Sequence, residues 1–105
     1  MSKDRRIVIT GMGAVTSLGL DLESTWEGIV NCRSGVSRIA LFNADTFPAK
    51  IAGEVKGFDV KKYIPKGYAF SDFMSRATKY GVGAAAMAME SAKINLKKLI
   101  SKQKN

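Results

Sequence analysis

The sequence predicts an α/β fold with an incomplete sheet, on the strength of three observations. A β-branched run at residues 5–10 is followed directly by a glycine-rich loop at 11–19. An amphipathic helix starts immediately after this loop, and a long helix rich in alanine and methionine occupies about 71–96. The order of strand, glycine loop and helix is typical of α/β proteins.

The first predicted strand is the run from Arg5 to Thr10, whose centre reads Ile-Val-Ile. A short apolar run of β-branched residues that stops at a glycine is typical of a strand buried on both faces. We therefore expect residues 5–10 to form a buried strand. A second strand is predicted at 50–55, after an irregular connection that contains Pro48.

The first helix is predicted to begin at Asp21, because an aspartate at the N-cap accepts hydrogen bonds from the first free amides of a helix. Its apolar residues recur at helical spacing: Leu22, Trp26, Ile29 and Val30. Gly35 suits the C′ position after the helix, where a left-handed backbone is common. On this pattern Trp26 is interpreted as a core residue rather than a stacking platform.

The long helix is expected to be capped by Ser71 or Asp72, and its many alanines favour helix formation. Each of the two glycines inside it would cost about 1 kcal/mol relative to alanine at an exposed position. One stripe of the helix contains Phe73, Ala77, Tyr80, Ala84, Met87 and Ser91. Since no charged residue occurs between Lys79 and Glu90, we interpret the helix as largely buried in a larger assembly.

Composition excludes several classes of protein. The 105 residues are 46% hydrophobic and 25% charged, which is ordinary for a small soluble domain. No apolar run is long enough to cross a membrane or to form a secretory signal. The single cysteine, Cys32, excludes an internal disulfide and fits a reducing cytoplasm, where we expect the protein to be located. Histidine is absent, which excludes Ser-His and Cys-His nucleophile pairs.

The glycine loop does not predict a cofactor. Gly11 and Gly13 match the first two glycines of a dinucleotide-binding loop, but Thr16 stands at the sixth position. About 20 residues later, where that motif requires an acidic residue, the sequence has Arg33 and Ser34. We interpret the two glycines as allowing a tight turn out of the first strand.

The remaining candidates predict neither a catalytic residue nor a metal site. Cys32 is interpreted as an inert, partly buried thiol, because no histidine is present to activate it. A chain with one cysteine and no histidine also lacks the usual zinc ligands. Two pairs of acids, Asp21 with Glu23 and Asp45 with Glu54, are interpreted as helix-start and loop residues.

The net charge of +8 lies mostly in the second half, where residues 53–105 contain eleven basic and four acidic residues. No acidic residue follows Glu90, and the lysines of the final stretch are Lys93, Lys97, Lys98, Lys102 and Lys104. A basic surface favours an acidic partner such as nucleic acid, anionic lipid or an acidic carrier protein, and the alternative is a solvated tail. No aromatic residues are interleaved with the lysines, so nucleic acid is not the expected partner.

The segment from Arg5 to Gly19 resembles the start of the elongating β-ketoacyl-acyl-carrier-protein synthases, which open with a basic pair, a strand and Thr-Gly-x-Gly-x-Val-Thr-Pro-Leu-Gly. Here Ser17 replaces the usual proline. The resemblance continues to about residue 95 through short matches in the same order: Glu23–Trp26, Ser34–Val36, Ile51–Val55, Phe58–Asp59, Tyr63–Ile64, Met74, Arg76, Thr78 and Tyr80. We therefore divide the chain into a partial β-ketoacyl synthase N-terminal domain at 1–95 and a basic tail at 96–105.

The resemblance implies an N-terminal fragment of a thiolase-like fold, in which two similar α/β halves form a layered structure that is usually a homodimer. It also implies the decarboxylative Claisen condensation of fatty acid or polyketide biosynthesis. In that family a cysteine at a strand-to-helix turn takes the acyl chain, and two histidines promote decarboxylation. These three residues lie downstream of the matched segment, so no catalytic residue is carried over, and Cys32 is not the nucleophile.

Acyl carrier protein is the partner that the resemblance implies. Relatives commonly enter the long helix through a basic stretch followed by Met-Asp. The corresponding residues 67–75 lack both the basic run and an aspartate after Met74, and the nearest cations are Lys66 and Arg76. This difference weakens the case for docking of the carrier protein at 67–75.

Three functions remain open at this stage. The first is a synthase fragment that is inactive alone and is completed by a complementary fragment or a homodimer. The second is a small basic module that binds an acidic partner, and the third is a remnant without activity. Two strands and two helices would leave a sheet edge and the alanine-rich helix uncovered. We therefore predict that the isolated chain is marginally stable or prone to aggregation.

Overall fold

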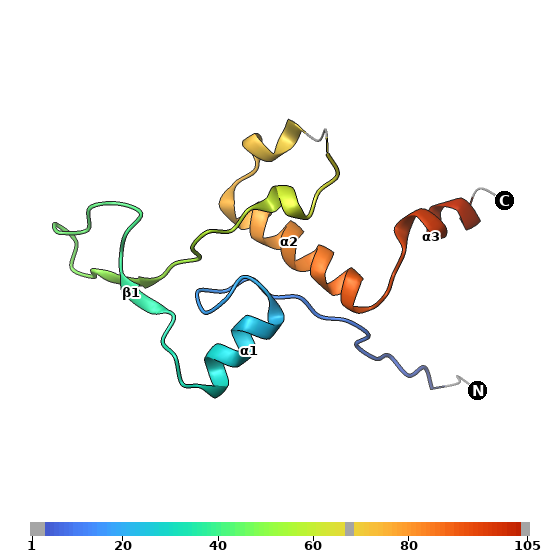
Figure 1. Cartoon of the computed structure of the whole chain (residues 1–105), viewed down its shortest axis with the longest axis horizontal. Coiled ribbons are helices and arrows are strands. Elements are labelled where there is room, and N and C mark those ends of the chain that lie inside the picture. The colour runs from blue at the N-terminus through green and yellow to red at the C-terminus, as the bar shows by residue number, and fades with distance from the viewer. Residues whose placement is uncertain (1–3, 67–68, 104–105) are drawn as a thin grey trace.

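The computed structural model describes residues 4–66 and 69–103. Figure 1 shows the elements following one another along the chain rather than around a common centre. In chain order they are the helix α1 (Leu22–Val30), the strands β1 (Val36–Arg38) and β2 (Ile51–Gly53), the 3₁₀ helices η1 (Val60–Lys62) and η2 (Ala69–Phe73), and the helices α2 (Arg76–Ser91) and α3 (Leu96–Gln103).

The molecule is far more extended than a closed domain of its length. Its radius of gyration is 18.3 Å, whereas a compact chain of this size has about 13 Å. Its accessible surface is 9058 Å², against about 5,800 Å² for a folded monomer of the same mass. Among the described residues, the apolar residues classed as buried are Ala44 and Val60, which keep 6% and 4% of their surface exposed. The fold is therefore an incomplete α/β arrangement, as predicted.

The sheet consists of β1 and β2, which pair in antiparallel fashion with Ser37 opposite Ala52. The Ile39 amide extends the ladder by donating to the Lys50 carbonyl over 2.9 Å. Strand β2 lies within the predicted range 50–55. Strand β1 was not predicted, because Val-Ser-Arg carries a single apolar residue and gives no periodic signal.

The prediction of a buried strand at residues 5–10 is wrong. These residues form no strand, and Ile7 and Ile9 are 93% and 82% exposed. The reason is that a strand exists only through hydrogen bonds to a neighbour, and no described segment of the chain lies beside this run. Its sequence favours a strand, but none of the segments that the structure describes pairs with it.

Helix α1 begins where predicted, at the N-cap Asp21, whose carboxylate accepts a hydrogen bond from the Ser24 amide over 2.7 Å. Its end differs from the prediction, since Cys32 rather than Gly35 takes the left-handed C′ position, with φ of 54°. The Cys32 amide donates to the Ile29 carbonyl and the Arg33 amide to the Gly28 carbonyl. This is the Schellman pattern of helix termination, formed here around a residue that carries a Cβ.

Helix α2 starts later than predicted. Neither Ser71 nor Asp72 caps it; both belong to η2, and the N-cap is Ser75, whose hydroxyl accepts from the Thr78 amide over 3.2 Å. The helix ends in a second Schellman pattern, with Lys93 at φ of 56°. There the Ile94 amide donates to the Met89 carbonyl over 3.0 Å.

Residues 96–103, predicted to be a basic tail, form the helix α3. The Asn95 side-chain oxygen accepts from the Lys98 amide and so acts as its N-cap. The division of domains after residue 95 stays a prediction. Of the residues interpreted above, Gly67, Tyr68 and Lys104 lie outside the described part of the chain. Within that part, no helix combines the length and apolar character that a membrane span requires.

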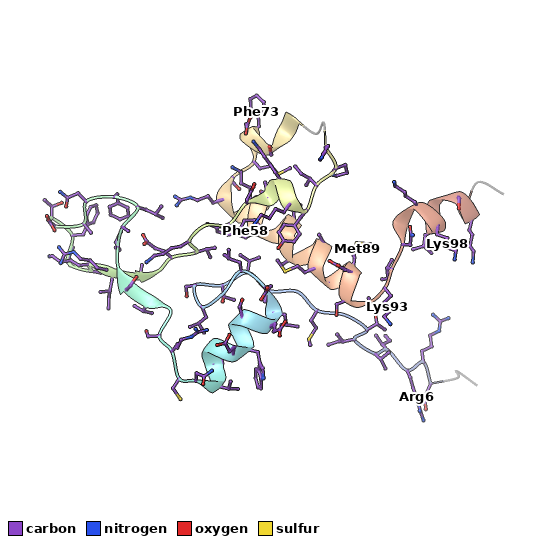
Figure 2. The ribbon with its side chains drawn as sticks, viewed as in Figure 1. Arg6, Phe58, Phe73, Met89, Lys93 and Lys98 are labelled. Carbon is purple, nitrogen blue, oxygen red and sulfur yellow. The ribbon has the colours of Figure 1, made fainter. Side chains whose placement is uncertain are left out.

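Aromatic side chains pack against one another around Phe58, which is labelled in Figure 2. The Phe58 ring stacks on Tyr63 at a centroid distance of 5.7 Å and meets the edge of Tyr80 at 5.4 Å. It also lies directly on Gly83 of α2, where a Cβ would overlap the ring. Gly81 faces open space by comparison. Glycine at position 83 is therefore required by close packing.

The predicted stripe of α2 is only partly covered. Tyr80, Ala84 and Met87 are partly buried, whereas Ala77 and Ser91 are exposed. Phe73 does not belong to the helix at all and is 88% exposed, pointing away from the rest of the chain in Figure 2. Much of the apolar surface that the sequence assigned to a core is therefore uncovered in this chain.

Candidate functional site

The glycine loop at 11–19 packs against α2 rather than around a ligand. A Cβ on Gly11 would collide with the backbone of Ala88 and Ala92, and one on Gly13 would collide with Ala84. Neither glycine has a positive φ. The prediction that these glycines serve a tight turn is therefore wrong. They are needed because the loop backbone lies directly on the helix.

Thr16 organises the second half of this loop. Its hydroxyl oxygen accepts from the amides of Leu18 and Gly19, over 3.1 and 3.3 Å, and lies 3.0 Å from the hydroxyl of the buried Thr25. Phosphate-binding loops present free amides to the anion. Here the amides of Leu18 and Gly19 are already used within the loop.

The N-terminus of α1 is likewise closed to an anion. Asp21 occupies it with its own carboxylate, which accepts from both the amide and the hydroxyl of Ser24. The hydroxyl and then the amide of Ser24 hold the pKa of Asp21 below its ordinary value. A phosphate placed there would be repelled by this carboxylate, so the N-terminus of α1 is not suited to the phosphates of a dinucleotide.

Cys32 is exposed, which corrects the interpretation as a partly buried thiol. Its role in the fold is to take the left-handed backbone conformation that ends α1. Across the described residues, no group of three or more histidine, cysteine, aspartate or glutamate side chains has an arrangement that would hold a metal ion.

Glu54 was interpreted from the sequence only as a loop residue, but the structure gives it a specific role. Its buried carboxylate follows β2 and accepts hydrogen bonds from the amides of Ala40 and Leu41, at 3.1 Å for the shorter contacts. These two amides, Ala40 first, hold the pKa of Glu54 below its ordinary value. Asp45, which the sequence paired with it, instead contacts Arg38 at 2.8 Å. Glu54 therefore fastens the loop between the strands.

Trp26 is 63% exposed, so the interpretation as a core residue is wrong. It lines an open groove between α1, α2 and the start of the glycine loop, with a volume of about 680 Å³. The groove, called the acidic groove below, has the apolar residues Met12, Leu22, Trp26 and Met87, the acids Asp21, Glu23 and Glu90, and Ser91. No periodic pattern could reveal it, because its two walls come from residues 12–26 and 87–91, which are far apart in sequence.

A second groove is basic. It lies where α2 turns into α3, has a volume of about 400 Å³ and is lined by Lys93, Ile94, Asn95, Lys98, Leu99 and Lys102. Figure 2 shows Lys93 and Lys98 on this part of the chain. The described lysines of the final stretch, Lys93, Lys97, Lys98 and Lys102, thus lie on one short helix and the turn before it.

Comparison with known proteins agrees with this arrangement. A family described as "Beta-ketoacyl synthase, N-terminal domain" matches residues 4–104. The 3-oxoacyl-[acyl-carrier-protein] synthase 2 of Staphylococcus aureus (strain COL) is 34% identical over 96 residues, covering 91% of this chain and 23% of the relative. The synthase 2 of Vibrio cholerae is 39% identical over 90 residues, covering 86% of this chain and 21% of the relative.

A solved structure is similar as well. The ishigamide ketosynthase/chain length factor superposes with a TM-score of 0.71 at 33% identity, over 84% of this chain and 21% of that one. The chain thus spans less than a quarter of the length of the relatives that it matches. The resemblance and the fold class predicted from the sequence are confirmed. This chain belongs to the β-ketoacyl synthase family and matches its N-terminal domain.

Proposed function

We propose that this chain is the N-terminal part of a 3-oxoacyl-[acyl-carrier-protein] synthase that works in the cytoplasm. It contributes to the decarboxylative condensation of an acyl thioester with a malonyl thioester once the remainder of the synthase is supplied. The observation that carries the proposal is the family match over residues 4–104, on a chain that spans 21–23% of its relatives.

The exposed apolar surface supports the requirement for a remainder. The extended run at residues 5–10 has an unpaired backbone and three apolar side chains in solvent. Apolar side chains exposed in a row are typical of a surface that another segment covers. An extended backbone whose amides and carbonyls are free can pair with a neighbouring strand. The chain also has no histidine, so the two histidines of the family's reaction must come from elsewhere.

Co-expression tests the proposal directly. The chain is produced together with a Vibrio cholerae synthase 2 from which the aligned 90 residues have been deleted. We expect the two to co-purify and to condense acyl and malonyl thioesters of acyl carrier protein, while each alone is inactive. If they neither associate nor condense the thioesters, the chain is a remnant and the proposal fails.

A matched pair of variants locates the contact. Val8→Pro removes an amide from the middle of the unpaired run and is expected to abolish co-purification, since proline cannot donate to a strand ladder. Asp4→Pro places the same residue just before the run and is expected to leave co-purification intact. Equal effects of the two variants would show that pairing of residues 5–10 does not hold the parts together.

The basic groove supports a second candidate function, that of a module for an acidic partner such as acyl carrier protein. Its three lysines and two apolar side chains suit a partner with an acidic, amphipathic surface. Titration of the chain with acyl carrier protein at two salt concentrations tests this. We expect binding that weakens strongly with salt, and binding that is absent or insensitive to salt would remove the candidate.

A further inference from the structure

We propose that copies of this chain associate with one another by docking helix α3 of one copy into the acidic groove of the next. The inference does not depend on the synthase proposal. It concerns the chain by itself, and the acidic partner of α3 is the acidic groove of another copy.

The groove has the composition of a docking site. Its floor is apolar, and Trp26, at 63% exposed, and Met12, at 55%, leave much of it open to solvent. Tryptophan in an open pocket is the residue type that most often anchors a protein partner. Such a floor is covered by an apolar or amphipathic segment rather than by water.

The rim of the groove gives the charge of its occupant. It carries three acids, and among the described side chains neither Glu23 nor Glu90 forms an ion pair. The third acid, Asp21, is engaged in capping α1. An apolar floor with an acidic rim fits a cationic amphipathic helix.

Helix α3 and the turn before it are such a segment. Lys97, Lys98 and Lys102 lie on the helix, Lys93 precedes it, and Leu99 is half exposed beside them. The described residues that follow Glu90 include no acid, and none of these lysines forms an ion pair with a described residue. The eight residues of α3 extend over about 12 Å.

The occupant is a second copy because α3 cannot reach the groove of its own chain. The Schellman pattern at Lys93 and the cap at Asn95 fix the direction in which α3 leaves α2. Figure 1 shows α3 projecting beyond the end of α2 and away from α1. Docking therefore joins different molecules, and the small area of one short helix predicts a Kd on the order of 10–100 µM.

Trp26 reports on the docking, since it is the one tryptophan of the chain and lies in the groove. On raising the protein concentration through this range, we expect its fluorescence to shift to the blue while sedimentation shows association. Salt should weaken both effects. The measurements are made in the Val8→Pro variant as well, so that strand pairing of residues 5–10 does not contribute.

Charge reversal provides the decisive experiment. One variant carries Glu23→Lys and Glu90→Lys, and the other carries Lys98→Glu and Lys102→Glu. Each alone is expected to stay monomeric, because the groove and α3 then have like charges. Mixed together, they are expected to associate again and to restore the blue shift. Their net charges become +12 and +4 from the original +8, so overall attraction cannot explain pairing of the mixture.

The control variant is Lys61→Glu with Lys62→Glu, which makes the same change of net charge as Lys98→Glu with Lys102→Glu at two exposed residues of η1 and should associate like the original chain. Circular dichroism checks that helix content is retained, and a variant that loses it is replaced by its glutamine counterpart. The proposal is overturned if the mixture stays monomeric, if the control loses association equally, or if the blue shift persists at all dilutions.

Discussion

Two regions of this molecule contain apolar side chains but differ in how these side chains are packed. Around Phe58 a short loop, η1 and α2 contact one another through an aromatic cluster and a glycine. Residues 5–10 include the three apolar side chains of Ile7, Val8 and Ile9 but lie extended in solvent. The difference shows that apolar sequence alone does not create a core, because a core also requires opposing surfaces that the same chain can bring together.

The largest effect is expected at the centre of the packed region. Phe58→Ala should lower the free energy of unfolding by about 2–4 kcal/mol, because it removes the ring that joins η1 to α2. Urea denaturation followed by circular dichroism measures the change. Ile7→Ala serves as the control and should change it by less than about 0.5 kcal/mol. Equal losses would mean that the two regions do not differ in packing as described.

The two glycines of α2 sharpen the comparison within a single helix. Gly83→Ala should destabilise the chain by about 1–3 kcal/mol, because its methyl group would overlap the Phe58 ring. Gly81→Ala should instead stabilise it by up to about 1 kcal/mol, since it faces open space and gains helix propensity. Thermal unfolding of both variants tests the pair, and a shift of Tm in the same direction for both would contradict it.

Glu54 makes one part of the fold sensitive to pH. Its pKa is lowered in the folded chain, so its contribution is complete above the ordinary value of about 4.3 and is lost as the pH falls through the lowered one. Protection of the Ala40 and Leu41 amides, measured as their exchange rate relative to an unstructured chain at the same pH, should be lost over this range. Glu54→Gln should make exchange fast at neutral pH also, whereas Glu27→Gln, on the exposed face of α1, should leave it unchanged.

The smallest effect is expected at the end of α1. Cys32→Gly should stabilise the chain by about 0.5 kcal/mol, because glycine takes the left-handed conformation without a Cβ penalty but gains entropy when unfolded. Asn31→Gly, at φ of −90°, should give no such gain. Chemical denaturation compares the two, and a destabilised Cys32→Gly would show that the thiol has a contact beyond this turn.

The features predicted correctly from the sequence are those that nearby residues determine. The start of α1 follows from Asp21 and its neighbours within four residues, and the interior of α2 follows from its alanines. The strand at 5–10 failed because pairing is decided by segments that its own residues do not specify. The turn at Cys32 failed because glycine at 35 gave the stronger signal, although the helix had already ended.

The grooves could not be predicted for a related reason. Trp26 has the spacing of a core residue, and only the positions of α1 and α2 show that nothing covers it. Helix α3 was mistaken for a tail because its lysines dominate its composition, although leucine or isoleucine recurs at 96, 99 and 100. The family, by contrast, was evident from ordered short motifs, which survive even where the strands themselves do not form.

The extended run at residues 5–10 also bears on how long the chain survives in a cell. Exposed segments without regular structure are preferred sites of proteolytic cleavage, and Arg5 and Arg6 offer basic residues to trypsin-like enzymes. A newly made copy would thus be vulnerable until another strand covers this run, after which cleavage would require unfolding first. Degradation would remove uncombined copies and spare combined ones, so the abundance of the chain would follow that of whatever covers residues 5–10.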